Sequence, residues 1–138
     1  MIPYGKQYTD FNDVKKVGNS IKNKYLTNGK ILEDFEKKIK INVKSKYSLA
    51  CSNGTSGLYL AFIALGINKN DIVIMPTINF VASANIAYFF GCKIFFADID
   101  IETGQMSPKT LANCIKKNNL KKIKIEITMY MGGHPNNI

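Results

Sequence analysis

The spacing of apolar residues along the chain changes near Tyr47. Before this residue, apolar side chains recur every three or four positions, as on one face of an amphipathic helix. This spacing predicts one helix over residues 9–25 and a second helix that Thr27 or Asn28 can cap. After Tyr47, short apolar runs alternate with helix-length segments. We therefore expect an N-terminal helical segment, residues 1–45, and an incomplete α/β domain, residues 46–138.

Four apolar runs predict strands, over residues 47–51, 71–76, 93–97 and 123–129. Helices are expected over residues 58–65 and 80–90 and from Pro108 onward, with Gly66, Gly91 and Ser107 at helix ends. Strands that alternate with helices indicate a mostly parallel sheet with flanking helices. Ligands of such sheets bind beyond the carboxyl ends of the strands, where residues 52–56, 77–80, 98–105 and 130–134 would lie.

The most specific motif is a glycine turn, Ser52-Asn53-Gly54-Thr55-Ser56-Gly57, between the first predicted strand and helix. Such a turn directs backbone N–H groups and the positive end of the helix dipole at one point, which favours a phosphate. A nucleoside-triphosphate loop is excluded because no lysine follows these glycines. A dinucleotide site is excluded because the next strand ends at Met75-Pro76 without a carboxylate. A tight turn that binds nothing explains the motif about as well.

The formal charge of +9 raises the hypothesis of nucleic-acid binding. All 19 basic residues are lysine, however, and arginine is the usual residue for gripping phosphate at two points. The lysines are interspersed with acidic and apolar residues, so a solvated surface explains the charge better than a nucleic-acid interface. No apolar run approaches the roughly 20 residues of a membrane span, and no export signal opens the sequence. A cytoplasmic protein without a membrane partner is expected.

Cysteine and histidine do not predict a metal site. Cys51, Cys92 and Cys114 are widely spaced in apolar contexts, which predicts buried and reduced thiols. The only histidine, His134, lies in a Gly-Gly-His-Pro turn with no Cys, Asp or Glu beside it to orient the ring. A structural role is expected for His134.

Several motifs occur along the chain in the same order as in a known protein family. They are Leu26-Thr27-Asn28-Gly29, Ser52-Asn53-Gly54-Thr55-Ser56-Gly57-Leu58, the run from Pro76 to Asn85, and Asp98-Ile99-Asp100 with Thr103-Gly104. The chain resembles the DegT/DnrJ/StrS-type sugar aminotransferases, which are pyridoxal 5'-phosphate enzymes of the aspartate-aminotransferase fold (fold type I). Residues 2–7 are similar to members that aminate UDP-linked 4-keto-6-deoxy-N-acetylhexosamines.

The resemblance implies roles for six residues. Gly54, Thr55 and Ser56 would hold the cofactor phosphate, and Phe80 would stack on its pyridine ring. Thr27 and Gly29 would lie near the sugar. Without the resemblance, Phe80 is more simply a core residue that starts a helix, and a helix-capping turn explains Thr27 and Gly29 equally well.

The resemblance also implies partners and a missing part. The whole enzyme would be a homodimer that transfers an amino group, with glutamate as the donor, to a nucleotide-linked keto sugar. The family's Schiff-base lysine and its pyridine-binding aspartate match positions beyond Ile138, so we expect no catalytic residue in this chain and no activity of the chain alone. The segment before the Tyr130 turn departs from the family pattern, in which a histidine stands there. A pyridoxamine-phosphate sugar dehydratase of the same family and a non-catalytic phosphate-ligand or interaction module remain alternatives.

Overall fold

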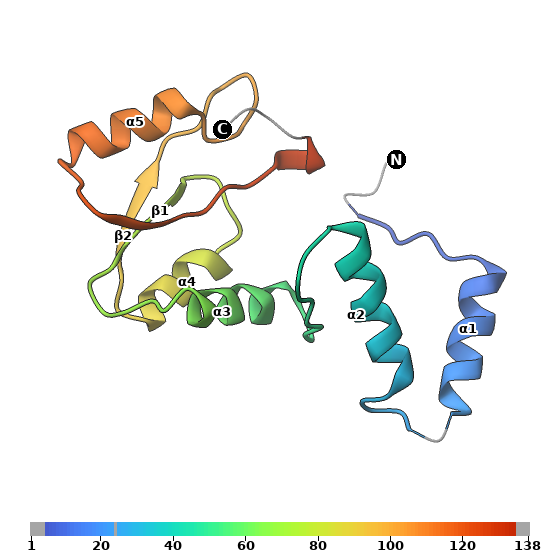
Figure 1. Cartoon of the computed structure of the whole chain (residues 1–138). Coiled ribbons are helices and arrows are strands. Elements are labelled where there is room, and N and C mark those ends of the chain that lie inside the picture. Colours follow the sequence, from blue (N-terminus) through green and yellow to red (C-terminus); the bar gives the residue numbers. More distant parts are fainter. Residues whose placement is uncertain (1–4, 24, 135–138) are drawn as a thin grey trace. The chain divides into compact units, whose positions relative to one another are not determined.

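A computed structural model of the chain describes residues 5–23 and 25–134. It divides into two compact units, Met1–Ala50 and Cys51–Ile138, and each is described by itself (Figure 1). Residues 2–4 of the segment compared above with the UDP-hexosamine enzymes lie outside the described residues.

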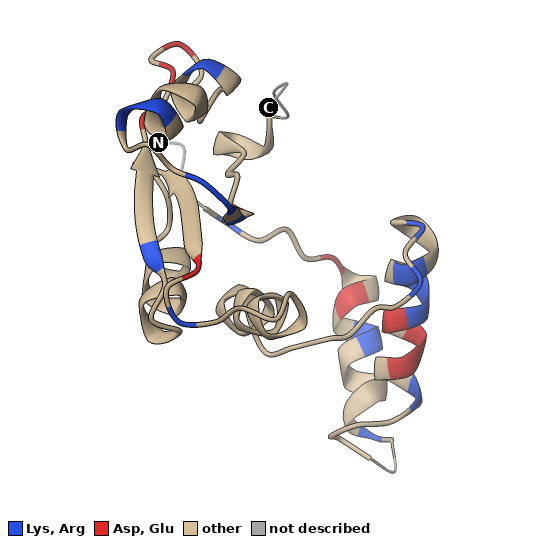
Figure 2. Cartoon of the chain, turned by 60° about the vertical axis from the view of Figure 1, so that its left-hand side comes forward, with Lys and Arg blue, Asp and Glu red and all other residues tan. Residues whose placement is uncertain are grey.

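The first unit contains two helices, α1 (Phe11–Ile21) and α2 (Lys30–Asn42). Asp10 caps α1, because its carboxylate accepts from the N–H of Asp13 at 3.0 Å while the Asp13 carboxylate accepts from the N–H of Asp10 at 3.0 Å. The hydrogen bond from Asp13 lowers the pKa of the Asp10 carboxyl. Both helices carry lysines and acidic residues together, as expected for a solvated surface (Figure 2).

The predicted cap of α2 is wrong. Gly29 is the N-cap residue and makes no side-chain hydrogen bond, so neither Thr27 nor Asn28 has this role. The carbonyl oxygen of Gly29 accepts from the N–H groups of Leu32 and Glu33 at 3.0 and 3.2 Å. Its φ of +141° lies in a region that glycine adopts without the steric cost that a Cβ would bring, so the turn into α2 requires a glycine here.

The second unit is built on a three-stranded parallel sheet. Its strands are β1 (Ile72–Pro76), β2 (Lys93–Ala97) and β3 (Ile123–Glu126), in the order β2-β1-β3. Ile74 of β1 pairs with Phe95 on one side and with Glu126 on the other. The predicted fold class, an α/β arrangement with a mostly parallel sheet, is confirmed.

Helices cover both faces of this sheet. Helices α3 (Gly54–Ala64) and α4 (Ala82–Phe89) lie on one face, and α5 (Pro108–Lys117) lies on the other (Figure 1). Val73 and Met75 pack into a cluster with Phe62 of α3 and with α4, whereas Ile74 packs with Cys114 of α5. This alternation follows from the two-residue period of a strand, and it buries β1 on both sides. The short 3₁₀ helix η1 (Met131–Gly133) follows β3.

The predicted helix ends are confirmed in the second unit. Gly66 and Gly91 follow α3 and α4 with φ of +62° and +70°, and each donates its N–H to a carbonyl of the last turn. Ser107 caps α5 through a reciprocal pair of hydrogen bonds with Thr110, and Pro108 occupies the first helical position.

Two expectations about residues 47–51 are wrong. This segment is not a strand, and Tyr47 and Leu49 are 77% and 73% exposed. A strand needs a neighbour for its ladder, and no strand among the described residues pairs with this one. Cys51 is exposed instead of buried, whereas Cys92 is half-buried and Cys114 is buried. Burial, followed by the negative charge of Asp71, raises the pKa of the Cys92 thiol.

Candidate functional site

The glycine turn forms the first turn of α3. The helix begins at Gly54, four residues earlier than predicted, and Asn53 is its N-cap. The side-chain Oδ1 of Asn53 accepts from the N–H of Ser56 at 2.8 Å, and its carbonyl oxygen accepts from the N–H of Gly57 at 3.1 Å. The second bond is the first regular bond of the helix, and the first bond satisfies the N–H of Ser56, one of the groups that a helix start leaves without an intrahelical partner.

Two backbone donors remain within the first helical turn. Within the described part of the chain, the N–H groups of Gly54 and Thr55 have no hydrogen-bond partner. Thr55 is exposed, and the hydroxyl of Ser56 lies 3.2 Å from that of Ser52. A Cβ on Gly54 would meet no atom within 4 Å, so the space beside the Cα of Gly54 is open.

These groups fit a single phosphate. Two N–H donors, two hydroxyls and the positive helix end occur together in this turn, and no acidic residue occurs in the first turn of α3. The geometry also limits which atoms of Ser56 can bind a phosphate. Its N–H is held by Asn53, so only its hydroxyl is available to a ligand.

Phe80 lies in the loop between β1 and α4. Thr77 begins this loop and donates its N–H to the carbonyl oxygen of Ala97 at 2.9 Å. The Phe80 side chain is 70% exposed, so it is not a core residue of this unit. The loop leaves the carboxyl end of β1, and the N-terminal ends of α3 and α4 lie on the same side of the sheet (Figure 1). The structure therefore brings the Gly54 turn and the Phe80 loop to one edge of the unit.

Two further loops of this edge are joined by Gln105. Its side chain is 2% exposed, and its Nε2 donates to the carbonyl oxygen of His134 at 2.9 Å. Gln105 thus links the loop after β2 to the segment after β3. Its Oε1 has no partner among the described residues. The sequence pattern gave no signal for this link, because a lone glutamine after a glycine looks like any loop residue.

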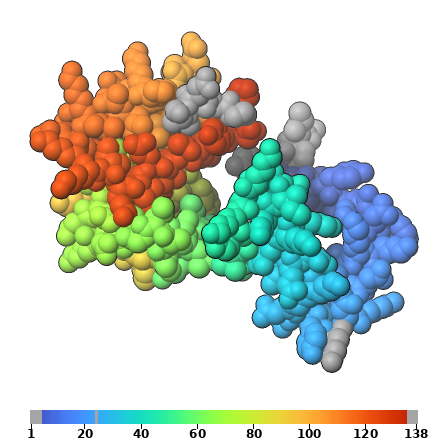
Figure 3. Space-filling view, in the orientation of Figure 1, coloured from blue at the N-terminus to red at the C-terminus, as the bar shows by residue number. Residues whose placement is uncertain are grey.

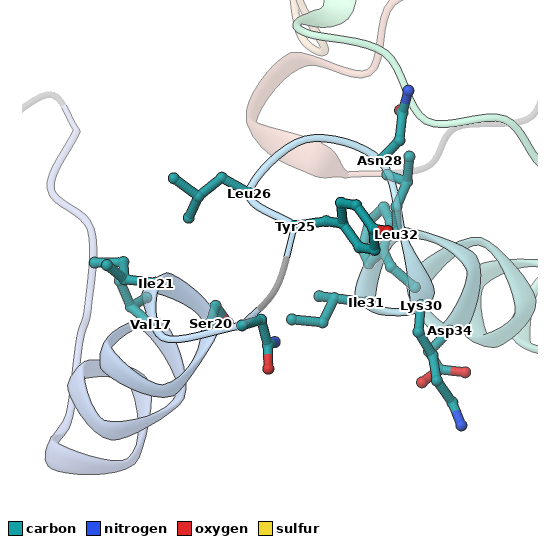
Figure 4. Close-up of a pocket in the computed structure, with 13 residues that line it drawn as sticks. Val17, Ser20, Ile21, Tyr25, Leu26, Asn28, Lys30, Ile31, Leu32 and Asp34 are labelled. Atoms are coloured by element: carbon teal, nitrogen blue, oxygen red, sulfur yellow. The ribbon is translucent and has the colours of Figure 1, made fainter.

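The predicted sugar residues belong to the first unit, which contains a groove of about 870 Å³ (Figure 4). The end of α1, the connection and the start of α2 line it. Most lining residues are apolar, including Val17, Ile21, Tyr25, Leu26, Ile31, Leu32 and Phe35. Asn28, Lys30 and Asp34 are among its polar members. Gly29 lines the groove, whereas Thr27 is exposed and does not.

The described residues contain no group of three or more His, Cys, Asp or Glu side chains that could hold a metal ion. In the same part of the chain, no helix has both the length and the apolar character needed to cross a bilayer.

Comparison with known proteins decides the family. The sequence profile of the DegT/DnrJ/EryC1/StrS aminotransferase family matches residues 7–138. The chain belongs to this family. A GDP-perosamine synthase of Escherichia coli O157:H7 is 36% identical over 107 residues, which are 78% of this chain and 28% of that protein. A UDP-4-amino-4,6-dideoxy-N-acetyl-beta-L-altrosamine transaminase of Campylobacter jejuni is 34% identical over 119 residues, 86% of this chain and 31% of that protein.

A solved structure similar to this chain contains a bound cofactor. NtdA of Bacillus subtilis, with bound PMP (pyridoxamine phosphate), matches with a TM-score of 0.79 and 26% identity over 92% of this chain and 29% of that chain. The predicted DegT family membership is confirmed, and so is the pyridoxal-phosphate type of cofactor at the level of the family. The chain spans about 30% of the length of the relatives that it matches.

Proposed function

We propose that this chain is the N-terminal part of a pyridoxal-phosphate-dependent aminotransferase that transfers an amino group from glutamate to a nucleotide-linked keto sugar. Residues 46–138 would be an incomplete cofactor-binding domain, and residues 1–45 its N-terminal helical segment. The observation that carries the proposal is the start of α3, where the N–H groups of Gly54 and Thr55 have no partner among the described residues in a chain of the DegT family.

Each site residue has a defined task in this proposal. The N–H groups of Gly54 and Thr55 and the hydroxyls of Thr55 and Ser56 bind the cofactor phosphate, helped by the dipole of α3. Phe80 stacks on the pyridine ring and fixes its plane. The cofactor, when bound, supplies the electron sink that amino transfer requires. The lysine and aspartate that act on it are proposed to lie beyond Ile138, as the resemblance implies, and the chain alone is proposed to be inactive.

The groove of the first unit is proposed to contact the sugar nucleotide. Gly29 lines it, and Tyr25, Asn28 and Lys30 add ring, amide and ammonium groups that suit a polar ligand with an apolar face. Thr27 is proposed as a contact of the same substrate from the rim of this turn. Relatives named as GDP-perosamine synthase and as a UDP-linked altrosamine transaminase support a nucleotide-linked sugar as the substrate class. A cytoplasmic homodimer is proposed for the whole enzyme.

The test uses the full-length protein that contains these residues. Thr55→Ala with Ser56→Ala removes both hydroxyls and keeps the backbone donors. We expect pyridoxal-phosphate affinity, measured by absorbance titration of the apoprotein, to fall at least about tenfold, because hydrogen bonds to charged groups are strong. Thr9→Ala, which removes an exposed hydroxyl of the first unit, is the control and should leave affinity unchanged.

The reaction is tested with the same protein, glutamate and a nucleotide-linked 4-keto sugar, and mass spectrometry identifies the product. An amino sugar is expected. A dehydrated sugar would identify the enzyme as a dehydratase of the same family. Unchanged affinity of the double variant would show that the Gly54 turn is only structural.

A further inference from the structure

The loop that carries Phe80 is fastened at both of its ends. At its start, Thr77 donates its N–H to the carbonyl oxygen of Ala97 at 2.9 Å, which continues the β1–β2 ladder by one residue. Near its end, Nδ2 of Asn79 donates to Oγ of Ser83 at 3.4 Å. Ile78 alone lies between the two fastened residues, so the backbone that leads into Phe80 has little freedom.

Ser83 is an unexpected residue at its position. It is 3% exposed and lies on the buried face of α4 with Ala82, Ile86 and Ala87. A buried hydroxyl destabilises a fold unless it forms a hydrogen bond, and alanine would fill nearly the same volume without that cost. The hydrogen bond from Asn79 explains why a hydroxyl is present at this position, whereas apolar packing does not explain it. The entry into α4 has no other side-chain cap, because Val81 is the N-cap residue and makes no such bond.

Phe80 itself is 70% exposed and Asn79 is half-buried. A mobile aromatic ring loses conformational freedom when it stacks on a ligand, and this loss weakens binding. Fixing the backbone that leads into Phe80 removes part of the loss before the ligand arrives. An exposed aromatic residue on a fastened loop is thus preorganised to stack on the ring of a ligand.

We infer that Asn79 and Ser83 are positioning residues for Phe80. Their hydrogen bond holds the end of the loop, so that the Phe80 ring stands ready for the pyridine ring of the cofactor. Neither side chain needs to touch the cofactor. The inference rests on the proposed function of Phe80 as the stacking residue.

The experiment measures pyridoxal-phosphate affinity in the full-length apoprotein, together with circular dichroism of the bound cofactor and the melting temperature without it. Asn79→Ala and Ser83→Ala are each expected to weaken affinity about three- to tenfold, in line with the loss of one hydrogen bond. Combining them should weaken affinity no further, because both remove the same bond. The cofactor dichroism should change, and Val81→Ala, an exposed neighbour, should leave affinity and dichroism unchanged.

A Phe80→Ala background separates positioning from mere stability. There, Asn79→Ala and Ser83→Ala should have no further effect on affinity, since the ring that they position is gone. Equal losses with and without Phe80 would overturn the inference, and so would unchanged affinity of both variants while Phe80→Ala still weakens binding. If Phe80→Ala alone leaves affinity unchanged, then the stacking role in the proposed function fails, and this inference fails with it.

Discussion

Asn53 decides which atoms at the start of α3 can meet a phosphate. Its side chain holds the N–H of Ser56 at 2.8 Å, so the backbone donors left over in the first turn of the helix come from Gly54 and Thr55. The residue thereby does two things: it stabilises the helix, and it selects the ligand-facing groups. Substitutions at Asn53 can separate these two effects, because some of them keep the cap and change the charge.

We predict that Asn53→Asp leaves the free energy of unfolding within about 0.5 kcal/mol, because aspartate caps helices as well as asparagine does. Pyridoxal-phosphate affinity should nevertheless fall at least about fivefold, since a carboxylate beside the turn repels the phosphate. Urea unfolding and cofactor titration of the full-length protein measure the two quantities. Asn53→Ala, the matched variant, should lose about 0.5–2 kcal/mol of stability. Undiminished affinity in Asn53→Asp would place the phosphate elsewhere.

The sequence named Gly54, Thr55, Ser56 and Phe80, because a turn motif and a family pattern are both local signals. The sequence did not predict which residue caps α3 and which N–H groups stay free. Ser52 and Asn53 are both good helix caps, and only the backbone path selects Asn53. The structure shows open donors at Gly54 and Thr55 and an exposed ring at Phe80, and ligand binding by these residues stays a prediction.

At the scale of elements, β1 organises the second unit. Its alternate side chains enter two separate clusters, so a substitution in β1 acts on one face of the sheet at a time. Ile74 is fully buried and packs against α5, whereas Ile101, in the loop after β2, is 95% exposed. Ile74 and Ile101 therefore allow the same substitution, isoleucine to alanine, to be compared at a buried and at an exposed position.

We predict that Ile74→Ala destabilises the full-length protein by about 2–5 kcal/mol, through lost apolar burial and the cavity left beside α5. Ile101→Ala should change the free energy of unfolding by no more than about 0.5 kcal/mol. Chemical denaturation of both variants gives the comparison. Similar values for the two would mean that the α5 side of the sheet contributes little to the stability of the core.

Elements bounded by strong local signals were predicted well, among them β2 and the capped start of α5. The predicted strand at residues 47–51 failed because a strand depends on a distant neighbour, and apolar composition does not supply one. The start of α3 was placed late because glycine and hydroxyl residues favour turns, whereas here they occupy the first helical positions.

At the scale of the whole molecule, much apolar surface is left uncovered. After its first turn, helix α3 is apolar on all sides, and in Figure 3 its green atoms form part of the visible surface. Ile63 is 51% exposed, and Tyr88 and Phe89 of α4 are 80% and 72% exposed. A helix that is apolar all round normally lies inside a larger protein. Such surface favours association when nothing covers it.

We predict that residues 1–138, expressed alone, do not melt cooperatively and associate with one another, because the uncovered faces of α3 and α4 promote aggregation. Pyridoxal phosphate trapped on this fragment with borohydride should be spread over several surface lysines. Calorimetry, light scattering and peptide mapping test the three parts of this prediction. A sharp melt with one stoichiometric lysine adduct would contradict it, and it would show that a lysine within these 138 residues is the reactive one.

The cap at Asn53 also bears on how the protein ages. Asparagine before glycine slowly loses its amide when the glycine nitrogen attacks the side-chain carbonyl, and the chain has two such steps, Asn28-Gly29 and Asn53-Gly54. The bond from Ser56 holds the Asn53 carbonyl against the helix, whereas Asn28 lies exposed in a turn with φ of +51°. On storage, peptide mapping should therefore find deamidation at residue 28 well before residue 53, and mild denaturant should remove the difference. The native fold would thus preserve the electroneutral turn that a phosphate requires for as long as α3 stays intact.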